Sequence, residues 1–448
     1  MTRMDNRDWE EALLLAFKHN SDFIARTVNL FNDNVKVYYI QTLVELPPLL
    51  ATLHQMAAGP EEDGTALGRV LLPFEHDANQ PAELLVDAML QGKLVVCREC
   101  SGKPVILDPG QLQNSRSVTS PQNENPLQSS FGAFTEDLNK NIGLLRKHLK
   151  MKDLTVETDY LGTNSLRRLA LLYVEGKANR KVVRQIKERL HRNKGNDVYS
   201  LTDLLGVLEQ PKYVLVPTYL STETPENAVQ NLLDGKVVLF LDQHPFALIF
   251  PALVKDLWSI KSDSNYPRLY ALFFCYIRLA GILFAIVMPG LYVVLNSVNP
   301  ELLRIQLAIS VSKSREGVPY PSLVEVLIML LLLEMVIEAT IRLPKSVGPT
   351  ITMIGGIILG QAIVQAKLVS NLLIIILAAS TIANYTMTGY LNTIGIRIYR
   401  YVVLIVSAVF GIYGLEAAII GLCIYFADLR TFSVPYLRLS AKGMPEDE

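Results

Sequence analysis

The last third of the chain is dominated by apolar runs long enough to cross a lipid bilayer. No charged residue occurs from Leu279 to Asn299, from Gly348 to Ala366, or from Leu368 to Ile396. A helix needs roughly 20 apolar residues to cross about 30 Å of hydrocarbon. Each run is therefore close to or above the length of a transmembrane helix.

Ionisable residues nevertheless lie within or beside apolar stretches of this region, at Arg278, Glu334, Glu338 and Glu416. Such a side chain at membrane depth costs at least about 2.5–3.5 kcal/mol on insertion scales, so it usually faces a bundle interior, a partner or water. In a chain without a catalytic motif, this pattern is typical of a channel, a transporter or a receptor.

The rest of the chain is polar, and its composition and motifs restrict the possible functions further. The 448 residues carry a formal net charge of −1, which gives no reason to expect nucleic-acid binding. The first 20 residues contain no apolar signal segment, so the polar half is expected in the cytosol. No catalytic motif occurs, and the Cys97–Cys100 pair has no second pair to complete a zinc site. We therefore expect no enzyme activity, no cofactor and no metal.

The polar half contains two similar stretches. Each has a short β-branched strand, a helix, and then a second helix that leads through Gly-Lys into another strand. The predicted helix in the first stretch runs from Pro48 to Met56, and Pro81–Val96 matches Pro225–Leu239. A linker rich in Ser, Asn, Gln and Pro runs from Asn114 to Asn125. The alternative is chance similarity of two amphipathic segments.

These patterns predict an α/β cytosolic region of two similar subdomains, followed by an α-helical transmembrane domain of about five spans. The expected divisions are a first subdomain at 1–110, a linker and amphipathic helix at 111–150, a second subdomain at 151–244, an interfacial or re-entrant segment at 245–265, the transmembrane domain at 266–430 and a tail at 431–448.

The five predicted spans are 268–295, 319–341, 347–367, 370–391 and 398–427, with an amphipathic surface helix between Asn299 and Pro321. Basic residues divide equally between the two sides, so they do not set the orientation. With five crossings, Arg430 and Arg438 lie on the opposite side of the membrane from Arg268.

Charged residues on the second span are candidates for an ion route. Glu334, Glu338 and Arg342 are four residues apart and share one helix face, whereas Glu325 lies off that face. Arg278, about ten residues into the first span, needs a carboxylate, which Glu334 or Glu338 could supply. The alternative is a purely structural pair of Arg342 with Glu338.

The third span contains Gly355, Gly356 and Gly360, followed by Gln361 and Gln365. Small residues four apart let helices approach closely. The span is therefore either a tightly packed helix or a helix that lines and gates a pore.

Many of these residues occur in an order that resembles the GerA family of spore germinant receptor A-subunits. The resemblance is densest from Thr222 to Leu437. The residues that carry it are Thr222-Glu223-x-Pro225-Glu226, Leu233-Asp234-Gly235-Lys236-Val237, Asp242-x-x-Pro245-Phe246, Met288-Pro289-Gly290-Leu291-Tyr292-Val293, Arg315-Glu316-Gly317-Val318-Pro319-Tyr320-Pro321, Arg342-Leu343-Pro344, Gly360-Gln361-Ala362 and Val434-Pro435-Tyr436-Leu437.

The resemblance implies an integral membrane subunit of a nutrient receptor in the spore inner membrane. Family A-subunits are expected to form a homo-oligomeric ring around a cation pore, with a pentamer as one candidate. The implied partners are a transporter-like B-subunit, a lipoprotein C-subunit and membrane lipid. In such a ring, the third span would supply a hydrophobic constriction between Ile354 and Leu359, which includes Ile358, with Gln361 and Gln365 beyond it. The alternatives are a secondary transporter and a non-conducting membrane scaffold.

Overall fold

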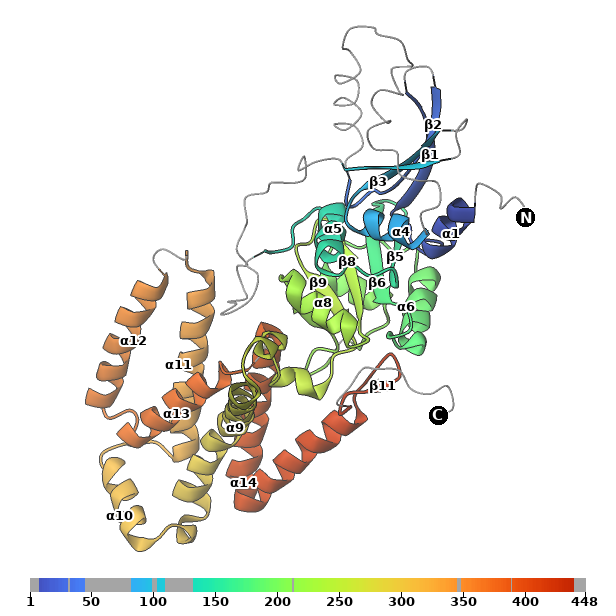
Figure 1. The fold of residues 1–448 in the computed structure, drawn as a ribbon. Coiled ribbons are helices and arrows are strands. Elements are labelled where there is room, and N and C mark those ends of the chain that lie inside the picture. The colour runs from blue at the N-terminus through green and yellow to red at the C-terminus, as the bar shows by residue number, and fades with distance from the viewer. Residues whose placement is uncertain are drawn as a thin grey trace.

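The computed structural model describes residues 8–30, 33–44, 82–98, 103–108, 132–211, 213–344, 348–387 and 389–438. Two antiparallel sheets with their helices form an α/β unit, and a helical region follows it (Figure 1). The predicted helix from Pro48 to Met56 and the predicted linker from Asn114 to Asn125 lie outside the described residues.

The first sheet has the strand order β1-β2-β3-β4, and every neighbouring pair is antiparallel. Helices α1 and α4 contact each other, and their apolar residues Leu13 and Met89 are buried with Val37 and Val95 of the sheet in one core. The elements are α1 (Asp8–Ala16), β1 (Phe23–Leu30), β2 (Asp33–Ile40), α4 (Ala82–Leu90), β3 (Leu94–Arg98) and β4 (Pro104–Leu107).

The second sheet has the order β5-β6-β8-β9-β7 and is covered by helices on both faces. Side chains alternate along a strand, so Leu239 packs with α6 and α7 while Val238 packs with α5 and α8. Burial of both faces explains why β8 is apolar throughout. The elements are α5 (Leu138–His148), β5 (Leu154–Leu161), β6 (Arg167–Val174), α6 (Arg180–Arg192), α7 (Leu201–Val207), β7 (Leu220–Thr222), α8 (Pro225–Leu233), β8 (Val237–Leu241) and β9 (Ala247–Phe250).

Strands β3 and β8 hold the same place in their sheets. Each is third in the strand order, pairs antiparallel with both neighbours, and follows a helix. The turns before them contain Gly92 and Gly235, each with φ +86°, a conformation that glycine adopts without steric cost. The segments matched by sequence therefore occupy equivalent positions.

A buried ion pair joins the two sheets. Arg146 of α5 is 1% exposed, and its Nε and Nη2 each donate to the Asp22 carboxylate at 2.7 Å. The neighbouring Asn20 carboxamide accepts from the Val156 N–H at 2.9 Å, and the Ser21 N–H donates to the Val156 carbonyl at 2.8 Å. The segment before β1 is thereby fixed to β5.

The predicted interfacial or re-entrant segment at 245–265 is wrong in its first part. Ala247–Phe250 forms β9, which is fully buried between β8 and β7. A short apolar run bounded by Pro245 and Pro251 fits a buried strand as well as a membrane segment, and only the pairing distinguishes them. Two turns, η2 (Val254–Leu257) and η3 (Lys261–Asn265), then lead to the helical region.

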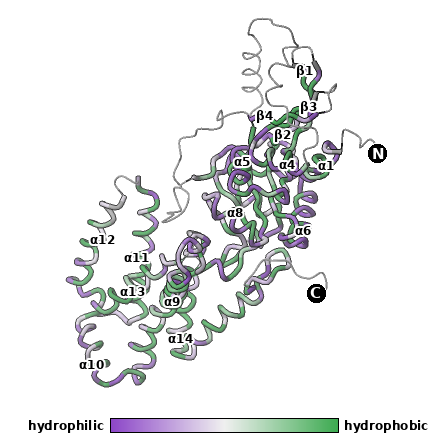
Figure 2. The backbone as a smooth tube through the Cα atoms, viewed as in Figure 1, coloured by the Kyte–Doolittle hydropathy of each residue, from purple (hydrophilic) through white to green (hydrophobic). Residues whose placement is uncertain are grey.

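Four helices lie at the positions of the first four predicted spans, with α13 shorter than predicted, and α10 lies at the position of the predicted surface helix between the first two. Figure 2 shows hydrophobic residues along most of α9, α13 and α14. By length and composition, the two helical stretches Arg268–Val298 and Leu391–Asp428 could each span a bilayer, and Met353–Gln365 and Asn371–Asn384 are shorter apolar helices. The elements are α9 (Arg268–Val293), η4 (Val294–Val298), η5 (Pro300–Leu302), α10 (Ile305–Ser314), α11 (Ser322–Arg342), α12 (Gly348–Gln365), α13 (Asn371–Asn384) and α14 (Tyr390–Asp428).

The predicted fifth span, 398–427, is instead a helical hairpin. Helix α14 breaks at Gly411, where φ is 63° and ψ is −142°, and its two arms form a V (Figure 1). Both arms return to the same residue of the α/β unit. Gly395 lies directly against the Leu215 carbonyl, and the Tyr425 hydroxyl accepts from the Leu215 N–H at 2.8 Å. The apolar run continues through the break, so its length alone predicts one helix.

Gly411 has little space for a side chain. The Asn299 side chain accepts from the Ile412 N–H at 3.1 Å, and a Cβ at Gly411 would overlap it. We expect Gly411→Ala to destabilise the protein by about 1–3 kcal/mol through backbone strain, with a further loss from displacing Asn299.

The matched control is Gly206→Ala in α7, where no described atom lies within 4 Å of an added Cβ. At an unstrained position such as this, replacing glycine by alanine is expected to stabilise the protein by about 0.4–1 kcal/mol. The measurement is Tm of the full chain in one detergent. An equal Tm for the two variants would show that the break is not required.

The C-terminal end of α14 returns to the α/β unit. The hairpin of β10 (Arg430–Thr431) and β11 (Val434–Pro435) buries Phe432 in the core beneath α6. The Tyr436 carbonyl also accepts from the Val254 N–H at 2.8 Å. Arg430 therefore lies on the same side as the start of α9, contrary to the five-span topology. The start of α9 and the end of α14 are both held by the α/β unit, so a chain that crosses a membrane between them crosses it an even number of times.

Candidate functional site

A carboxylate on α11 meets two arginines on the first arm of α14. Arg400 Nη2 lies 3.0 Å from Glu334 Oε1, Arg397 Nε lies 3.2 Å from the same oxygen, and Arg397 Nη2 contacts the other carboxylate oxygen. The arginines are three residues apart, so they share one helix face. Arg400 is 2% exposed, and this cluster is the most buried charged contact between α11 and α14 among the described residues.

The predicted partner of Arg278 is wrong. Its guanidinium contacts the Asp263 carboxylate, with Nη2 3.1 Å from Oδ1, and Nη1 donates to the Trp258 carbonyl at 3.3 Å. The η3 turn folds back along the first turns of α9, so a carboxylate only 15 residues earlier reaches the arginine. Arg278 therefore holds α9 to the α/β unit and does not contact Glu334 or Glu338.

Glu338 and Arg342 form the simple i,i+4 pair that their spacing predicts. Arg342 Nη2 donates to Glu338 Oε1 at 2.6 Å, and the two side chains are 56% and 77% exposed in the single chain. The structure thus separates the four predicted residues into three contacts: Arg278 with Asp263, Glu334 with α14, and Glu338 with Arg342.

Glu325 is a buried polar residue that the sequence analysis set aside. Its carboxylate accepts from the Ser370 N–H at 2.6 Å, lies 3.3 Å from the Tyr292 hydroxyl, and lies 3.4 Å from Arg315 Nε. Ser370 is the N-cap of α13, where exposed N–H groups favour a negative charge. Glu325 therefore joins α9, α11 and α13. Its sequence signal was a lone acidic residue in the first turn of an apolar helix.

The predicted gate residues lie on an unusually open helix. Helix α12 packs mainly against α11, and no described atom lies within 4 Å of a Cβ added at Gly355, Gly356 or Gly360. Ile354 and Ile358 are also exposed in the single chain. Tight packing of this glycine face is therefore not found among the described residues of one copy. Gln361 and Gln365 are exposed as well.

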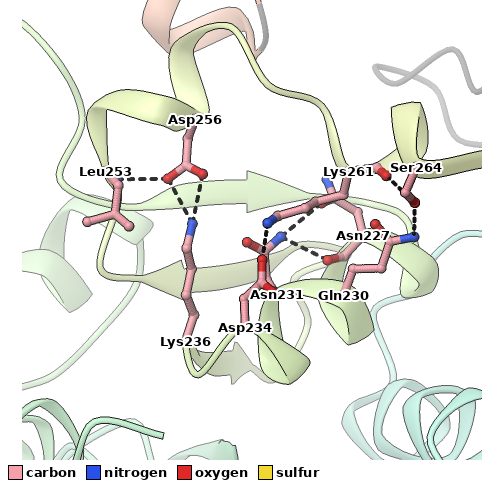
Figure 3. Close-up of polar contacts among 9 residues, drawn as sticks. All are labelled: Asn227, Gln230, Asn231, Asp234, Lys236, Leu253, Asp256, Lys261 and Ser264. Carbon is pink, nitrogen blue, oxygen red and sulfur yellow. Dashed lines mark hydrogen bonds and ion pairs between the residues drawn. The ribbon is translucent and has the colours of Figure 1, made fainter. Parts of the chain in front are cut away.

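A buried ion pair joins Lys236, just before β8, to Asp256 of the η2 turn (Figure 3). Lys236 is 2% exposed, and its Nζ lies 2.7 and 2.9 Å from the two Asp256 oxygens. Asp256 also accepts from the Leu253 N–H at 2.7 Å, which fixes the η2 turn. Burial lowers the pKa of the Lys236 ammonium, and the Asp256 charge acts in the opposite direction.

Helix α8 is linked to the η3 turn beside this pair. Lys261 contacts the Asp234 carboxylate, and the Gln230 amide donates to the Ser264 hydroxyl at 3.4 Å (Figure 3). Because η3 also carries Asp263, which holds Arg278, these contacts connect the sheet to the first apolar helix.

Metal ligands are not grouped in the part of the chain that the structure describes: no three His, Cys, Asp or Glu side chains are placed to hold an ion. Cys97 is buried on β3. Cys100, the other member of the predicted pair, lies outside the described residues.

Comparison with known proteins gives consistent matches over most of the chain. It is 30% identical over 428 residues to spore germination protein A1 of Bacillus subtilis, covering 95% of this chain and 88% of that protein. Spore germination protein GerLA of Bacillus cereus is 30% identical, with 81% and 74% covered. The uncharacterized membrane protein YfkQ of Bacillus subtilis is 29% identical, with 78% and 68% covered.

A solved structure is also similar to part of the chain. It is the N-terminal domain of the A subunit of the Bacillus megaterium spore germinant receptor GerK3, at 23% identity and a TM-score of 0.38, covering 55% of this chain and 93% of that one. The sequence pattern described as Bacillus/Clostridium GerA spore germination protein matches residues 11–447. This match spans nearly the whole chain, from α1 to the C-terminal tail. The protein therefore belongs to the GerA spore germination protein family.

Proposed function

We propose that this chain is the membrane subunit of a spore nutrient-germinant receptor and forms a ring-shaped, ligand-gated cation channel. The family match and the relatives named spore germination proteins support the receptor role. The proposed location is the spore inner membrane, with the α/β unit in the cytosol. A transporter-like B-subunit and a lipoprotein C-subunit are the proposed partners.

The observation that carries the channel proposal is the open face of α12. Of the four glycines in this 18-residue apolar helix, Gly355, Gly356 and Gly360 have no described atom near an added Cβ. Ile354 and Ile358, on the side of the helix opposite Gly356 and Gly360, are also exposed within one described copy. Small residues favour close helix contact in a membrane, where lipid offers little packing specificity. Copies of α12 around a common axis would supply those contacts and line a pore, which a homo-oligomer such as a pentamer provides.

In this proposal the helices make six crossings rather than five. Helices α9, α11, α12 and α13 each contribute one segment, and the two arms of α14 contribute the others. This arrangement returns the chain to the cytosolic side, where Tyr436 contacts Val254. The α/β unit is proposed to consist of two similar subdomains, supported by the equivalent places of β3 and β8.

Cross-linking through α12 tests the ring. In a chain with its four native cysteines replaced, we expect Gly356→Cys to form disulfide-linked dimers in the membrane under mild oxidation. Gly356 would face a second copy at close range. The control is Ile424→Cys, on the second arm of α14, which is 63% exposed and is expected to face lipid. Equal cross-linking at both positions, or none at Gly356, would contradict the ring.

Ion flux separates the channel from its alternatives. Purified chain in liposomes is expected to conduct K⁺. Gly356→Leu is expected either to close the pore or to make it leak, because the bulky side chain changes the constriction. A secondary transporter would show substrate-coupled flux, and a scaffold would show none. If cysteines at 354, 358 and 361 never react with water-borne thiol reagents, α12 does not line the route. The Glu334 face of α11 then becomes the candidate.

A further inference from the structure

Helix α10 is amphipathic, and none of its residues is buried. At 100° per residue, Ile305, Ala308 and Ile309 lie on one face, while Gln306 and Ser310 lie on the opposite one. Ile305 is 79% exposed. Helix α10 makes only a small contact with α13, so an apolar face this open on a ten-residue helix requires an occupant outside the described part of the chain.

The position of α10 restricts that occupant. Helix α9 has 26 residues, which at 1.5 Å per residue is about 39 Å, so its end lies about one bilayer thickness from the α/β unit. Only Asn299–Arg304 separates η4 from the first residue of α10, and 315–321 leads from α10 into α11. A helix tethered at both ends to apolar helices cannot leave the surface of the bilayer.

The break in α14 lies at the same level as the end of α9. Asn299 holds the Ile412 N–H, and the residues that flank the break, Phe410 and Tyr413, are both largely exposed. Exposed aromatic residues are typical of the membrane–water interface. The connection that leads into α10 and the break in α14 therefore lie together at one end of the helical region.

A hollow of about 550 Å³ lies along the apolar face of α10. It is lined by Pro300, Glu301, Leu303, Ile305, Ala308, Ile309, Ser312 and Lys313. The charged lining residues are Glu301, before the start of α10, and Lys313, in its last turn. The apolar lining between them matches the acyl chain of a phospholipid, and the Lys313 ammonium matches its phosphate.

We propose that α10 lies flat in the headgroup layer of the leaflet farthest from the α/β unit and binds phospholipid in this hollow. The proposal rests on the proposed membrane insertion of α9 and α11. It gives α10 the role of an interfacial anchor that fixes the depth of the Gly411 turn and the ends of the surrounding helices.

Fluorescence quenching in the full chain tests this anchor. Single cysteines placed at Ile309, Ser310 and Leu283 carry an environment-sensitive fluorophore, in nanodiscs of phosphatidylcholine and phosphatidylglycerol. The label at 309 is expected to be quenched by lipids with a nitroxide near the headgroup and not by aqueous iodide. The label at 310, on the polar face, is expected to be quenched by iodide.

The label at Leu283 on α9 separates the two proposals, because lipids with a deep nitroxide should quench it if α9 is inserted. Loss of that signal would overturn the membrane insertion itself. With Leu283 quenched, iodide quenching at 309 would place α10 in water. Protection of the 309 label from both quenchers would mean that protein, such as a second copy, covers this face. Either result overturns the lipid anchor.

Discussion

Replacing Glu334 by glutamine is expected to destabilise the helical region strongly. The variant leaves Arg397 and the buried Arg400 close together without their carboxylate. Removing one partner of a buried ion pair commonly costs about 3–5 kcal/mol, because the remaining charge stays buried and uncompensated. For a domain of this size, such a loss lowers Tm by about 10 °C. The measurement is the monodisperse fraction of the full chain after heating in detergent.

Glu338→Gln is the matched control, one helical turn away on α11. Its pair with Arg342 is exposed, and exposed i,i+4 pairs contribute only about 0.3–0.5 kcal/mol. The double variant Glu334→Gln with Arg397→Gln should recover part of the loss, because it removes one of the two uncompensated charges. Equal heat sensitivity of the two single variants would show that Glu334 does not bear the contact between α11 and α14.

Lys236→Met is the second change with a large expected effect. It leaves the Asp256 carboxylate buried at the joint between the sheet and α9, again at a cost of about 3–5 kcal/mol. Because Asp256 also fixes the Leu253 N–H in the η2 turn, the loss should loosen the connection to α9. We expect a Tm lower by about 10 °C and faster proteolysis between β9 and α9.

The control for this change is Lys194→Met. Lys194 pairs with Asp159 at the surface, where both side chains are well exposed and an ion pair contributes about 0.2–1 kcal/mol. Adding Asp256→Asn to Lys236→Met should restore part of the stability, because the amide still accepts from the Leu253 N–H without a buried charge. If the double variant is no more stable than Lys236→Met, the buried charge is not the cause.

The positions of the first four apolar helices were predictable from the sequence. Helix formation and membrane insertion depend on the apolar length of a continuous segment, which can be counted directly. The same locality explains the Glu338–Arg342 pair, since residues four apart on a helix always face the same way. Repeated Gly-Lys turns likewise predicted that β3 and β8 would take equivalent places.

The partners of the charged residues depended on distant parts of the chain. Glu334 contacts Arg397, which lies 63 residues away, and no spacing rule connects helices separated by two others. Arg278 also lies in an apolar helix, but its carboxylate partner is Asp263 in the preceding η3 turn. The need of a buried charge for a partner follows from the sequence, whereas the identity of that partner follows from packing.

The sequence by itself determined that this protein has a polar α/β part and an apolar helical part with charges that require partners. The reason is that residue composition fixes which segments can be exposed to water and which cannot. Only the tertiary structure decided that α14 reverses at Gly411 and that Phe432 returns to the core of the α/β unit. Gly411 is one of three glycines in the run 401–427, and the sequence does not mark it as the point of reversal. The reversal depends on the contact of Asn299 beside Gly411 and on the contacts of Leu215 with both arms, which form only when the chain is folded.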